Sequence, residues 1–444
     1  MSGSKIINYV VTPAANASEN IFQGEITVPG DKSISHRSIM LGSLAKGKTE
    51  VTGFLEGEDS LATLKAFAKM GVEITGPESG KLTIEGVGIH GLEEPDSALD
   101  LGNSGTSMRL MSGLLSGQHF KTVLVGDESL SGRPMKRVTN PLTEMGADIE
   151  THDGTAPLRI NANNKLTAIE YDMPIASAQV KSCLLLAGMY ADGKTCVTEP
   201  GVTRDHTERM LKAFGYPVNV EGNKVCIEGG HELTACDIQI PADISSSAFF
   251  LVGASICSGA NLLIKNVGIN PTRTGVIDIL KLMGANISLE NSRMFGGEPV
   301  ADIRVQHSQL KGIKIPEELV PLAIDEFPVL FIAAACAEGQ TVLTGAEELR
   351  VKESDRIQAM ADGLVTLGVD ATATDDGIII NGGELGGGTV KSFDDHRIAM
   401  AFAIAGLKAS DTINIIDCAN VATSFPGFVE LCGSINLNIA ITEQ

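Results

Sequence analysis

The feature that most constrains the fold is a sequence pattern that returns six times along the 444-residue chain. In each copy an apolar, helix-like run ends at a small residue, and an alternating strand follows. The residues that end the six runs lie 66 to 80 positions apart, at Gly47, Gly117, Gly193, Gly259, Gly339 and Ser410. Such even spacing predicts six copies of one α/β unit.

A second helix of period 3.6 lies between these copies, and a glycine followed by a strand closes it. Glycine takes the left-handed conformation without strain, so it is the natural residue just after a helix. The closing residues are Gly71, Gly146, Gly215, Gly284, Gly368 and, in a weaker form, Gly433. Each copy is therefore predicted to hold two helices and several strands.

A unit of this size buries its helices poorly alone, so several units should pack round a shared centre. The sequence predicts an α/β (α+β) fold of two domains with three repeats each, and an inter-domain cleft where ligands bind. The crossing between the halves is expected where the strand at 238–240 meets Pro241. The predicted first domain is 24–241, and the second is 1–23 with 242–444.

Charge and composition exclude several classes of partner. The chain has 34 basic and 55 acidic side chains and a formal charge of -21, which argues against nucleic acid and anionic membranes. The absence of Trp and the 4% aromatic content argue against base stacking. The longest apolar stretches, 248–256 and 329–336, are too short to span a bilayer, and no signal sequence is recognisable. We expect a cytoplasmic protein that meets any anionic ligand in a local basic pocket.

The cysteines give no sign of a metal site. None stands in a C-x-x-C pair, which leaves a zinc site or a redox dithiol without support. We expect all eight to be reduced and mostly buried, and we expect neither a metal nor a cofactor. They are Cys183, Cys196, Cys226, Cys236, Cys257, Cys336, Cys418 and Cys432.

The first polar cluster is the segment 29–37, a glycine turn followed by a predicted helix start. Ser33 is expected to cap this helix, while Lys32 and Arg37 add positive charge to its N-terminus, which attracts anions. The alternative is a capped helix with exposed cations. His36 is interpreted as a hydrogen-bonding residue rather than a catalyst.

Similar clusters open the next two repeats. Gly102 and Gly105 let the backbone approach a ligand closely, and Arg133, which precedes Pro134, is predicted to be extended and able to reach a ligand. Small polar groups at predicted helix entrances suit a phosphate. They include Asn103, Thr106, Ser177 and Gln179. Arg204 adds a cation at another predicted helix entrance.

In the second half, the segment 350–356 is predicted to begin a helix. Lys352 and Arg356, four residues apart, would then share a face with Glu353 beside them. The alternative is a solvated helix with salt bridges. Asp325 and Asp394 precede two apolar helices, and each taken alone is interpreted as a helix N-cap.

The polar clusters occupy equivalent points of the repeat, each at the start of the apolar helix. We therefore expect the six helix N-termini to converge, so that their dipoles and the Lys and Arg side chains form an anion trap within an acidic protein.

These motifs also carry a family resemblance. The runs PGDKSISHR, LGNSGTSMRL, SLSGRPM, RVKESDR, DDHRIAM and SFPGF closely resemble the 5-enolpyruvylshikimate-3-phosphate synthase family, over essentially the whole chain. That family has two domains of three α/β repeats. The resemblance implies transfer of the enolpyruvyl group of phosphoenolpyruvate to the 5-hydroxyl of shikimate 3-phosphate, with release of phosphate. We also expect the protein to be a monomer. This addition and elimination needs a base at the hydroxyl and an acid at the methylene carbon.

The resemblance also implies roles for individual residues. Asp325 would handle the hydroxyl proton, Glu353 would protonate the methylene carbon, and Lys352 and Lys32 would assist. The residues implied for shikimate 3-phosphate are Lys32, Ser33, Arg37, Ser177, Ala178, Gln179, Arg204, Asp325 and Lys352. Those implied for phosphoenolpyruvate are Lys32, Asn103, Gly105, Arg133, Gln179, Arg356, His396 and Arg397.

Three positions depart from the plant and enterobacterial pattern: Ser424 replaces a Lys, Glu348 an Asn and Leu110 a Pro. These departures resemble the divergent bacterial class with reduced glyphosate sensitivity, although Gly105 leaves room at the phosphoenolpyruvate site. Two rival interpretations remain. One is the related transferase acting on UDP-N-acetylglucosamine, whose cysteine-bearing loop has no counterpart at 126–137; the other is a non-catalytic binder of shikimate 3-phosphate.

Overall fold

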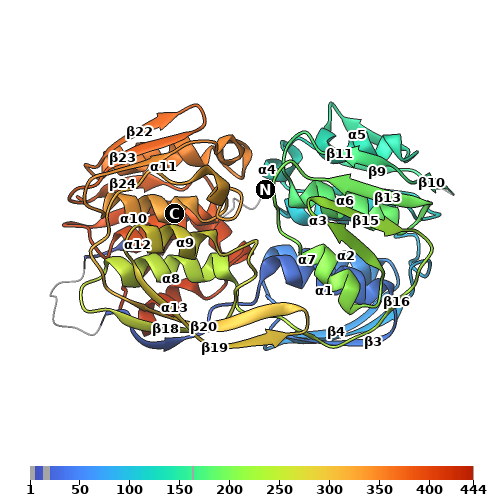
Figure 1. Ribbon diagram of the computed structural model, residues 1–444, viewed down its shortest axis with the longest axis horizontal. Coiled ribbons are helices and arrows are strands. Elements are labelled where there is room, and N and C mark those ends of the chain that lie inside the picture. The colour runs from blue at the N-terminus through green and yellow to red at the C-terminus, as the bar shows by residue number, and fades with distance from the viewer. Residues whose placement is uncertain (1–5, 14–20, 163–164, 444) are drawn as a thin grey trace. The chain divides into compact units, whose positions relative to one another are not determined.

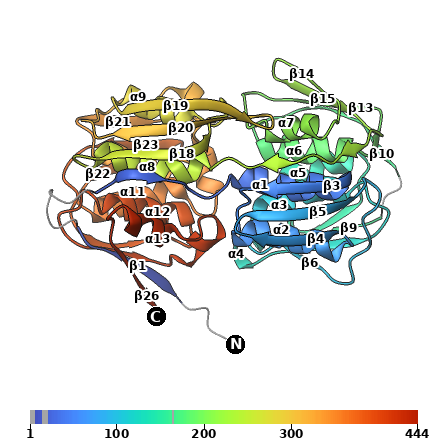
Figure 2. The ribbon, with the colours of Figure 1, turned by 90° about the horizontal axis from the view of Figure 1, so that it is seen from below.

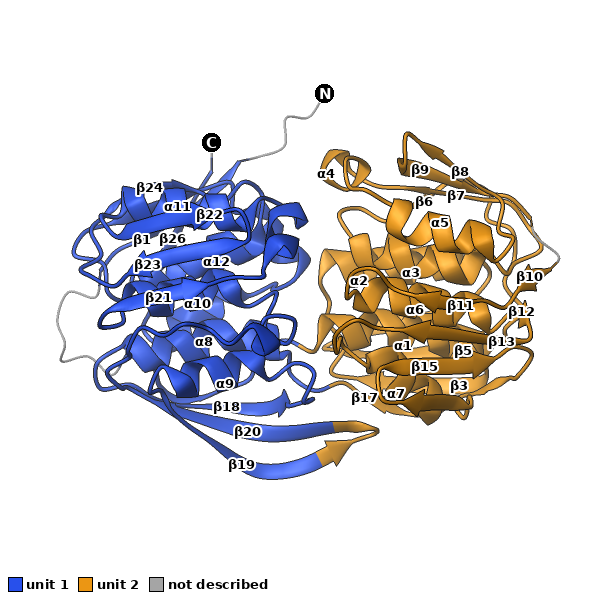
Figure 3. Cartoon of the chain, turned by 45° about the horizontal axis from the view of Figure 1, so that its top comes forward, with its two compact units in different colours: residues 1–29, 241–293, 299–444 blue, residues 30–240, 294–298 orange. Residues whose placement is uncertain are grey.

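The computed structural model describes residues 6–13, 21–162 and 165–443. The chain forms two compact units (Figure 3): unit 1 comprises residues 1–29, 241–293 and 299–444, and unit 2 comprises residues 30–240 and 294–298. The predicted domain start at residue 24 is wrong, because strand β2 (Gln23–Ile26) pairs in parallel with β18 (Asn261–Gly268) of unit 1. Residues 294–298 were predicted to belong to the second domain, but they belong to unit 2.

Unit 2 contains three repeats, each with a mixed sheet and two principal helices (Figure 1). The first repeat consists of α1 (Lys32–Leu44), β3 (Ala45–Thr52), α2 (Glu58–Lys69), β4 (Glu73–Glu78) and β5 (Lys81–Val87), joined by β16 (Leu233–Thr234) and β17 (Ile238–Gln239). The second consists of β6 (Leu99–Asp100), α3 (Gly105–Leu115), β7 (Thr122–Val125), α4 (Glu128–Ser131), α5 (Lys136–Glu144), β8 (Ile149–His152) and β9 (Thr155–Ile160). The third consists of β11 (Glu170–Asp172), α6 (Ala178–Gly188), β13 (Lys194–Thr198), α7 (His206–Ala213), β14 (Val218–Glu221) and β15 (Lys224–Glu228), with the small pair β10 (Leu166–Thr167) and β12 (Ala191–Asp192) nearby in sequence.

Unit 1 repeats the plan. Its first repeat consists of β2, α8 (Ile244–Ile256), β18, α9 (Gly275–Leu282), β19 (Asn286–Phe295) and β20 (Glu298–Gln306). The next consists of the 3-10 helix η1 (Glu317–Leu319), α10 (Phe327–Ala335), β21 (Gln340–Leu343), η2 (Glu347–Val351), α11 (Arg356–Thr366), β22 (Asp370–Thr374) and β23 (Gly377–Asn381). The last consists of β1 (Ile7–Val11), β24 (Gly388–Lys391), α12 (His396–Ala405), β25 (Ile413–Ile416), η3 (Ala419–Thr423), α13 (Phe428–Ser434) and β26 (Ile439–Glu443).

The six main sheets share one topology. In five of them the strand after the first helix pairs with the second arm of a hairpin from the same repeat, as in the order β3-β5-β4. In the sixth sheet β1 takes this middle place, lying antiparallel to both β25 and β26, and Figure 2 shows β1 and β26 side by side. The six predicted repeats are thus confirmed, with the sixth completed by the N-terminal strand.

The first helix of each repeat forms the core of its unit. Every residue of α8 and of α10 is buried. Helix α10 is apolar on all sides, whereas α8 also contains serines, of which Ser247 and Ser255 donate to the carbonyl oxygens of Asp243 and Leu251. In unit 2, α3 packs so closely on α6 that a Cβ at Gly113 would lie 2.0 Å from the carbonyl oxygen of Cys183. Glycine is needed there for the two backbones to meet.

The predicted closing glycines behave as expected in five repeats. The φ angles of Gly71, Gly146, Gly215, Gly284 and Gly368 lie between 78° and 96°. The sixth assignment is wrong: Gly433 lies inside α13, and Asn436, with φ of 64°, takes the left-handed position after that helix. Asparagine is the residue that best replaces glycine in this role.

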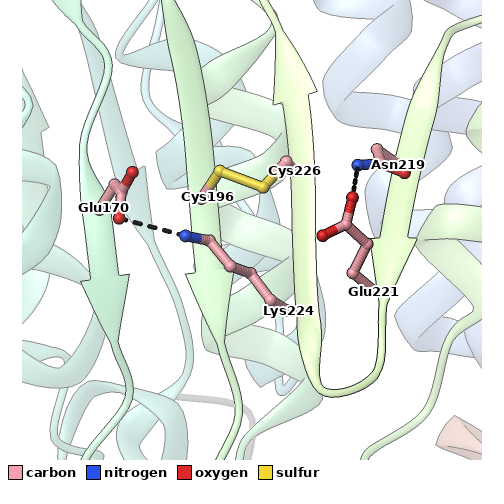
Figure 4. Close-up of a disulfide and its surroundings, with 6 residues drawn as sticks. All are labelled: Glu170, Cys196, Asn219, Glu221, Lys224 and Cys226. Carbon is pink, nitrogen blue, oxygen red and sulfur yellow. Dashed lines mark hydrogen bonds and ion pairs between the residues drawn. A yellow bond between two sulfur atoms is a disulfide. The ribbon is translucent and has the colours of Figure 1, made fainter.

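The cysteine prediction is wrong for one pair. Cys196 of β13 and Cys226 of β15 form a disulfide, shown in Figure 4. The two residues face each other across the antiparallel ladder, with their Cα atoms 4.1 Å apart, a proximity that their spacing in sequence does not reveal. The other six cysteines are unpaired thiols. Burial raises the pKa of Cys183 to about 12, so this thiol stays protonated.

Candidate active site

In unit 2 the first turns of α1, α3 and α6 meet. Nδ1 of His36 lies 2.8 Å from Oγ1 of Thr63 and 3.3 Å from Oγ of Ser107 at the start of α3. Arg109 of α3 donates from Nη1 to Oε1 of Gln179 at 2.6 Å, which ties α3 to α6. The predicted convergence of helix starts is therefore found among these three helices.

His36 is a buried, hydrogen-bonded residue, as the sequence suggested. Burial, with smaller effects from the charges of Lys32 and Arg37, lowers the pKa of His36 to about 3. The imidazole is therefore neutral near pH 7.

The cap of α1 differs from the prediction. Asp31, not Ser33, caps the helix, and its Oδ1 accepts the N–H of Ile34 at 2.9 Å. Ser33 lies inside the first turn, where its carbonyl oxygen accepts from Nη1 of Arg37. Lys32, the first residue of α1, points its Nζ to Oδ2 of Asp59 at 3.0 Å. Asp59 thus sets the position of this predicted site lysine.

Arg37 is buried, with 4% of its surface exposed. It donates from Nε to Oγ1 of Thr207 at 2.7 Å and from Nη2 to Oγ of Ser182 at 2.8 Å. Burial lowers its pKa to about 10, the carboxylates of Glu208 and Asp31 oppose this shift, and the charge of Arg204 adds to it. The positive charge of Arg204 thus acts on Arg37, and two cations that repel each other favour the binding of an anion.

Asn103 and Arg133 are in contact. Arg133 donates from Nη2 to Oδ1 of Asn103 at 2.6 Å and to Oγ of Ser129 at 3.1 Å. Arg133 lies outside the helices on either side of it, between α4 and α5. A Cβ built at Gly105 would lie 3.2 Å from the Nη1 atoms of both Arg109 and Arg133. Gly105 therefore leaves space for the guanidinium groups.

The start of α6 presents small polar groups. Ser177 is its N-cap and Ala178 its first residue, and Gln179 donates from Nε2 to Oγ1 of Thr106 at 3.0 Å. Ser177 also lines a cavity of about 240 Å³ with the cations Lys136 and Arg137.

In unit 1, Asp325 is the meeting point of two cations. Its Oδ1 lies 3.4 Å from Nζ of Lys352 and 3.4 Å from Nη1 of Arg356. Nη2 of Arg356 also donates to Oε2 of Glu353 at 2.5 Å. Both the predicted base and the predicted acid are thus bound to the same guanidinium.

A helix does start in the segment 350–356, but the predicted sharing of one helix face by Lys352 and Arg356 is wrong. The 3-10 helix η2 ends at Val351, and α11 begins only at Arg356, so Lys352 and Glu353 lie in the connection between two helices. Asp355 caps α11 by accepting the N–H of Gln358. The non-helical connection brings Lys352 and Arg356 to one carboxylate without placing them on a common helix face.

Two N-cap assignments also fail. Asp325 precedes Glu326, which is the N-cap of α10, and α12 is capped by Asp395 rather than by Asp394. Asp395 is fully buried, and its Oδ1 accepts the N–H of Arg397 at 2.9 Å while its Oδ2 accepts from Ser354 at 3.0 Å.

Arg397 lies over the start of α10. Its Nη1 donates to the carbonyl oxygen of Asp325 at 2.8 Å and lies 3.8 Å from Oε1 of the buried Glu326. His396, the first residue of α12, is buried. The starts of α10 and α12 therefore meet, as the repeat predicted.

Sequence reasoning missed several supporting residues. Asp395 appeared only within a motif, and Asp59 was not singled out. The buried Lys181, paired with Glu199 and Glu208, was also overlooked. The sequence signal that could have identified Lys181 is a charged residue inside an otherwise apolar helix, which indicates a buried charge with partners.

Within the described ranges, 6–13, 21–162 and 165–443, no helix is long and apolar enough to cross a membrane. The same part of the chain contains no group of three or more His, Cys, Asp or Glu side chains suited to holding a metal ion.

Residues 17–431 match the model of EPSP synthase, 3-phosphoshikimate 1-carboxyvinyltransferase. The chain belongs to this family. The 3-phosphoshikimate 1-carboxyvinyltransferase of Methylococcus capsulatus is 66% identical over 421 residues, covering 95% of this chain and 96% of that protein. That of Alkalilimnicola ehrlichii is 64% identical over 422 residues, covering 95% and 94%. The EPSP synthase structure from Acinetobacter baumannii has a TM-score of 0.88 and 59% identity, covering 99% of this chain and all of that one.

Membership of the EPSP synthase family confirms both the resemblance and the predicted α/β fold class. The activity inferred from the motifs is the one that gives this family its name. The match also favours this family over the related UDP-N-acetylglucosamine transferase.

Proposed function

We propose that the protein transfers the enolpyruvyl group of phosphoenolpyruvate to the 5-hydroxyl of shikimate 3-phosphate and releases phosphate, in the shikimate pathway. The observation that carries this proposal is the arrangement at Asp325. One carboxylate lies within 3.4 Å of both Lys352 and Arg356, and a second carboxylate, Glu353, is held by the same arginine. Addition followed by elimination needs a base and an acid among cations.

Asp325 takes the proton of the 5-hydroxyl, and Lys352 stabilises the carboxylate and the developing charge. Glu353 delivers a proton to the methylene carbon and then recovers it on elimination. Arg356 and Arg397 hold phosphoenolpyruvate, and the 3.4 Å contact of Arg356 with Asp325 is the one that a substrate oxygen would replace. His396 supports this group from the start of α12.

Residues of unit 2 also bind anionic groups of both substrates. Arg37 and Arg204, with the start of α6, suit the phosphate and carboxylate of shikimate 3-phosphate. Arg133, Asn103 and Gly105 suit phosphoenolpyruvate. Lys32 and Gln179 serve both substrates, and Ser33, Ser177 and Ala178 complete the set for shikimate 3-phosphate.

The test is phosphate release from phosphoenolpyruvate by the purified protein, with shikimate 3-phosphate in one assay and UDP-N-acetylglucosamine in the other. Release with the first acceptor alone is expected. Binding of shikimate 3-phosphate without phosphate release would leave the non-catalytic binder as the better description. The protein is further proposed to act as a cytoplasmic monomer, which light scattering at several concentrations can test.

A further inference from the structure

A buried charge cluster lies behind the arginines proposed to bind shikimate 3-phosphate. Lys181 of α6 is 2% exposed, and its Nζ contacts Oε1 of Glu199 and, at 2.6 Å, Oε1 of Glu208. Glu199 and Glu208 are each 4% exposed. Buried charges are costly to maintain unless each is paired and hydrogen-bonded, so the placement of these three needs an explanation.

Glu199 connects this cluster to a loop. It follows β13, and its Oε2 accepts both the N–H and the Oγ1–H of Thr203, at 2.9 and 2.6 Å. The backbone of Glu199 is itself held by Asn223, which donates from Nδ2 to the Glu199 carbonyl at 2.6 Å. The carboxylate therefore fixes the loop immediately before Arg204.

The other side of Arg204 is also anchored. Asp205 accepts from Nε of Arg209 at 2.8 Å, and Nη1 of Arg209 donates to the carbonyl oxygen of Gly297 at 3.0 Å. Both neighbours of Arg204 are thus tied to the rest of unit 2, which fixes its backbone.

Glu208 links the cluster to the second arginine. It lies one residue after Thr207, whose Oγ1 accepts from Arg37 and donates to Ser182. Its charge is also among those that act on Arg37. Lys181 thus pairs with two carboxylates. Glu199 binds Thr203, the residue before Arg204, and Glu208 follows Thr207, which binds Arg37.

We propose that Lys181 and Glu199 are positioning residues that, through Thr203, set the spacing between Arg204 and Arg37 for the phosphate or carboxylate of the substrate. This inference rests on the proposed function, since it takes shikimate 3-phosphate as the ligand of the two arginines. Lys181 and Glu199 need not touch that ligand. Their effect is on the affinity for shikimate 3-phosphate and not on proton transfer.

The test replaces Thr203, because Lys181→Met would leave two buried carboxylates without their cation and threaten folding. Thr203→Val removes the hydroxyl at nearly constant shape, and Thr203→Ser restores it. Thr195→Val is the matched control, because Thr195 is buried in β13 and its hydroxyl has no hydrogen-bond partner among the described residues. Binding of shikimate 3-phosphate is measured by calorimetry, and kcat is measured with both substrates saturating.

Thr203→Val should raise the Kd for shikimate 3-phosphate roughly five- to tenfold, the value of about one hydrogen bond. Thr203→Ser and Thr195→Val should stay within about twofold of wild type, and so should kcat in all three variants. Unchanged affinity in Thr203→Val, or equal losses in the Val and Ser variants, would overturn the inference. If the wild type itself fails to bind shikimate 3-phosphate, the proposed function fails, and the inference fails with it.

Discussion

Arg356 and Asp395 form a buried two-bond ion pair, in which Nε donates to Oδ2 at 2.8 Å and Nη2 donates to Oδ1 at 3.2 Å. Burial lowers the pKa of Arg356, but the charges of Asp395, Glu353 and Asp325 outweigh this effect and raise it. Asp395 also caps α12. It therefore fixes both the orientation of the Arg356 guanidinium and the first turn of α12, which carries Arg397.

Replacing Asp395 by Asn should lower kcat/KM for phosphoenolpyruvate roughly 10- to 100-fold, because Asn keeps the cap but removes the charge that orients Arg356. Steady-state kinetics at saturating shikimate 3-phosphate measures this. The exposed neighbour Asp394, with φ of 54°, provides the control, since Asn tolerates that conformation. Equal effects of Asp394→Asn and Asp395→Asn would contradict the assignment.

Replacing Glu353 by Gln should reduce kcat about 10²- to 10⁴-fold and leave substrate affinity nearly unchanged, because Gln accepts the Arg356 hydrogen bond but donates no acidic proton. Phosphate release and calorimetric binding give the two quantities. Glu347→Gln, in the exposed part of η2, should leave both unchanged. Wild-type turnover in Glu353→Gln would remove Glu353 as the acid.

Replacing Gly105 by Ala should raise KM for phosphoenolpyruvate roughly fivefold or more, since the new methyl group would lie 3.2 Å from Nη1 of Arg133 and displace it. Affinity for shikimate 3-phosphate should change little. Gly433→Ala is the control, because a Cβ at Gly433 meets no atom within 4 Å among the described residues. A KM for phosphoenolpyruvate that matches the wild type would show that Arg133 adjusts or does not bind this substrate.

His36 makes stability depend on pH. Its folded pKa of about 3 lies below the ordinary value of 6.5, so the unfolded chain binds the proton more readily. The contribution of His36 to the free energy of unfolding is therefore complete above pH 6.5. It declines as pH falls toward 3, by up to about 1.4 kcal/mol per pH unit.

Thermal unfolding from pH 7.5 to about pH 4.5 tests this linkage. The stability advantage of wild type over His36→Gln should shrink with falling pH. Comparing the two proteins at each pH cancels the contributions of the titratable groups that they share. A constant advantage of wild type over His36→Gln across this range would refute the linkage.

The repeated architecture could be predicted because it rests on local periodicity. Five of six closing glycines and the strand after each apolar helix follow from patterns within a few residues. The exceptions are local substitutions, such as Asn436 after α13, where another residue performs the same conformational role.

The contacts that organise the site could not be predicted in the same way. The partners of Arg356 include Asp325 and Asp395, which only the folded chain brings together. A lysine inside an apolar helix marks Lys181 as unusual but does not identify its carboxylate partners, which follow in later elements, and Cys196 meets Cys226 only through strand register. A pattern within one segment carries no information about such pairs.

The place of β1 in the last sheet has a consequence for biosynthesis. Among the described strands, β1 leaves the ribosome before all the others, yet its neighbours β25 and β26 are made after all the others. Nearly all of unit 2 is one continuous segment, 30–240, which can fold while synthesis continues. Strand β1 of unit 1 therefore has to be kept from wrong pairings until β25 and β26 have been made.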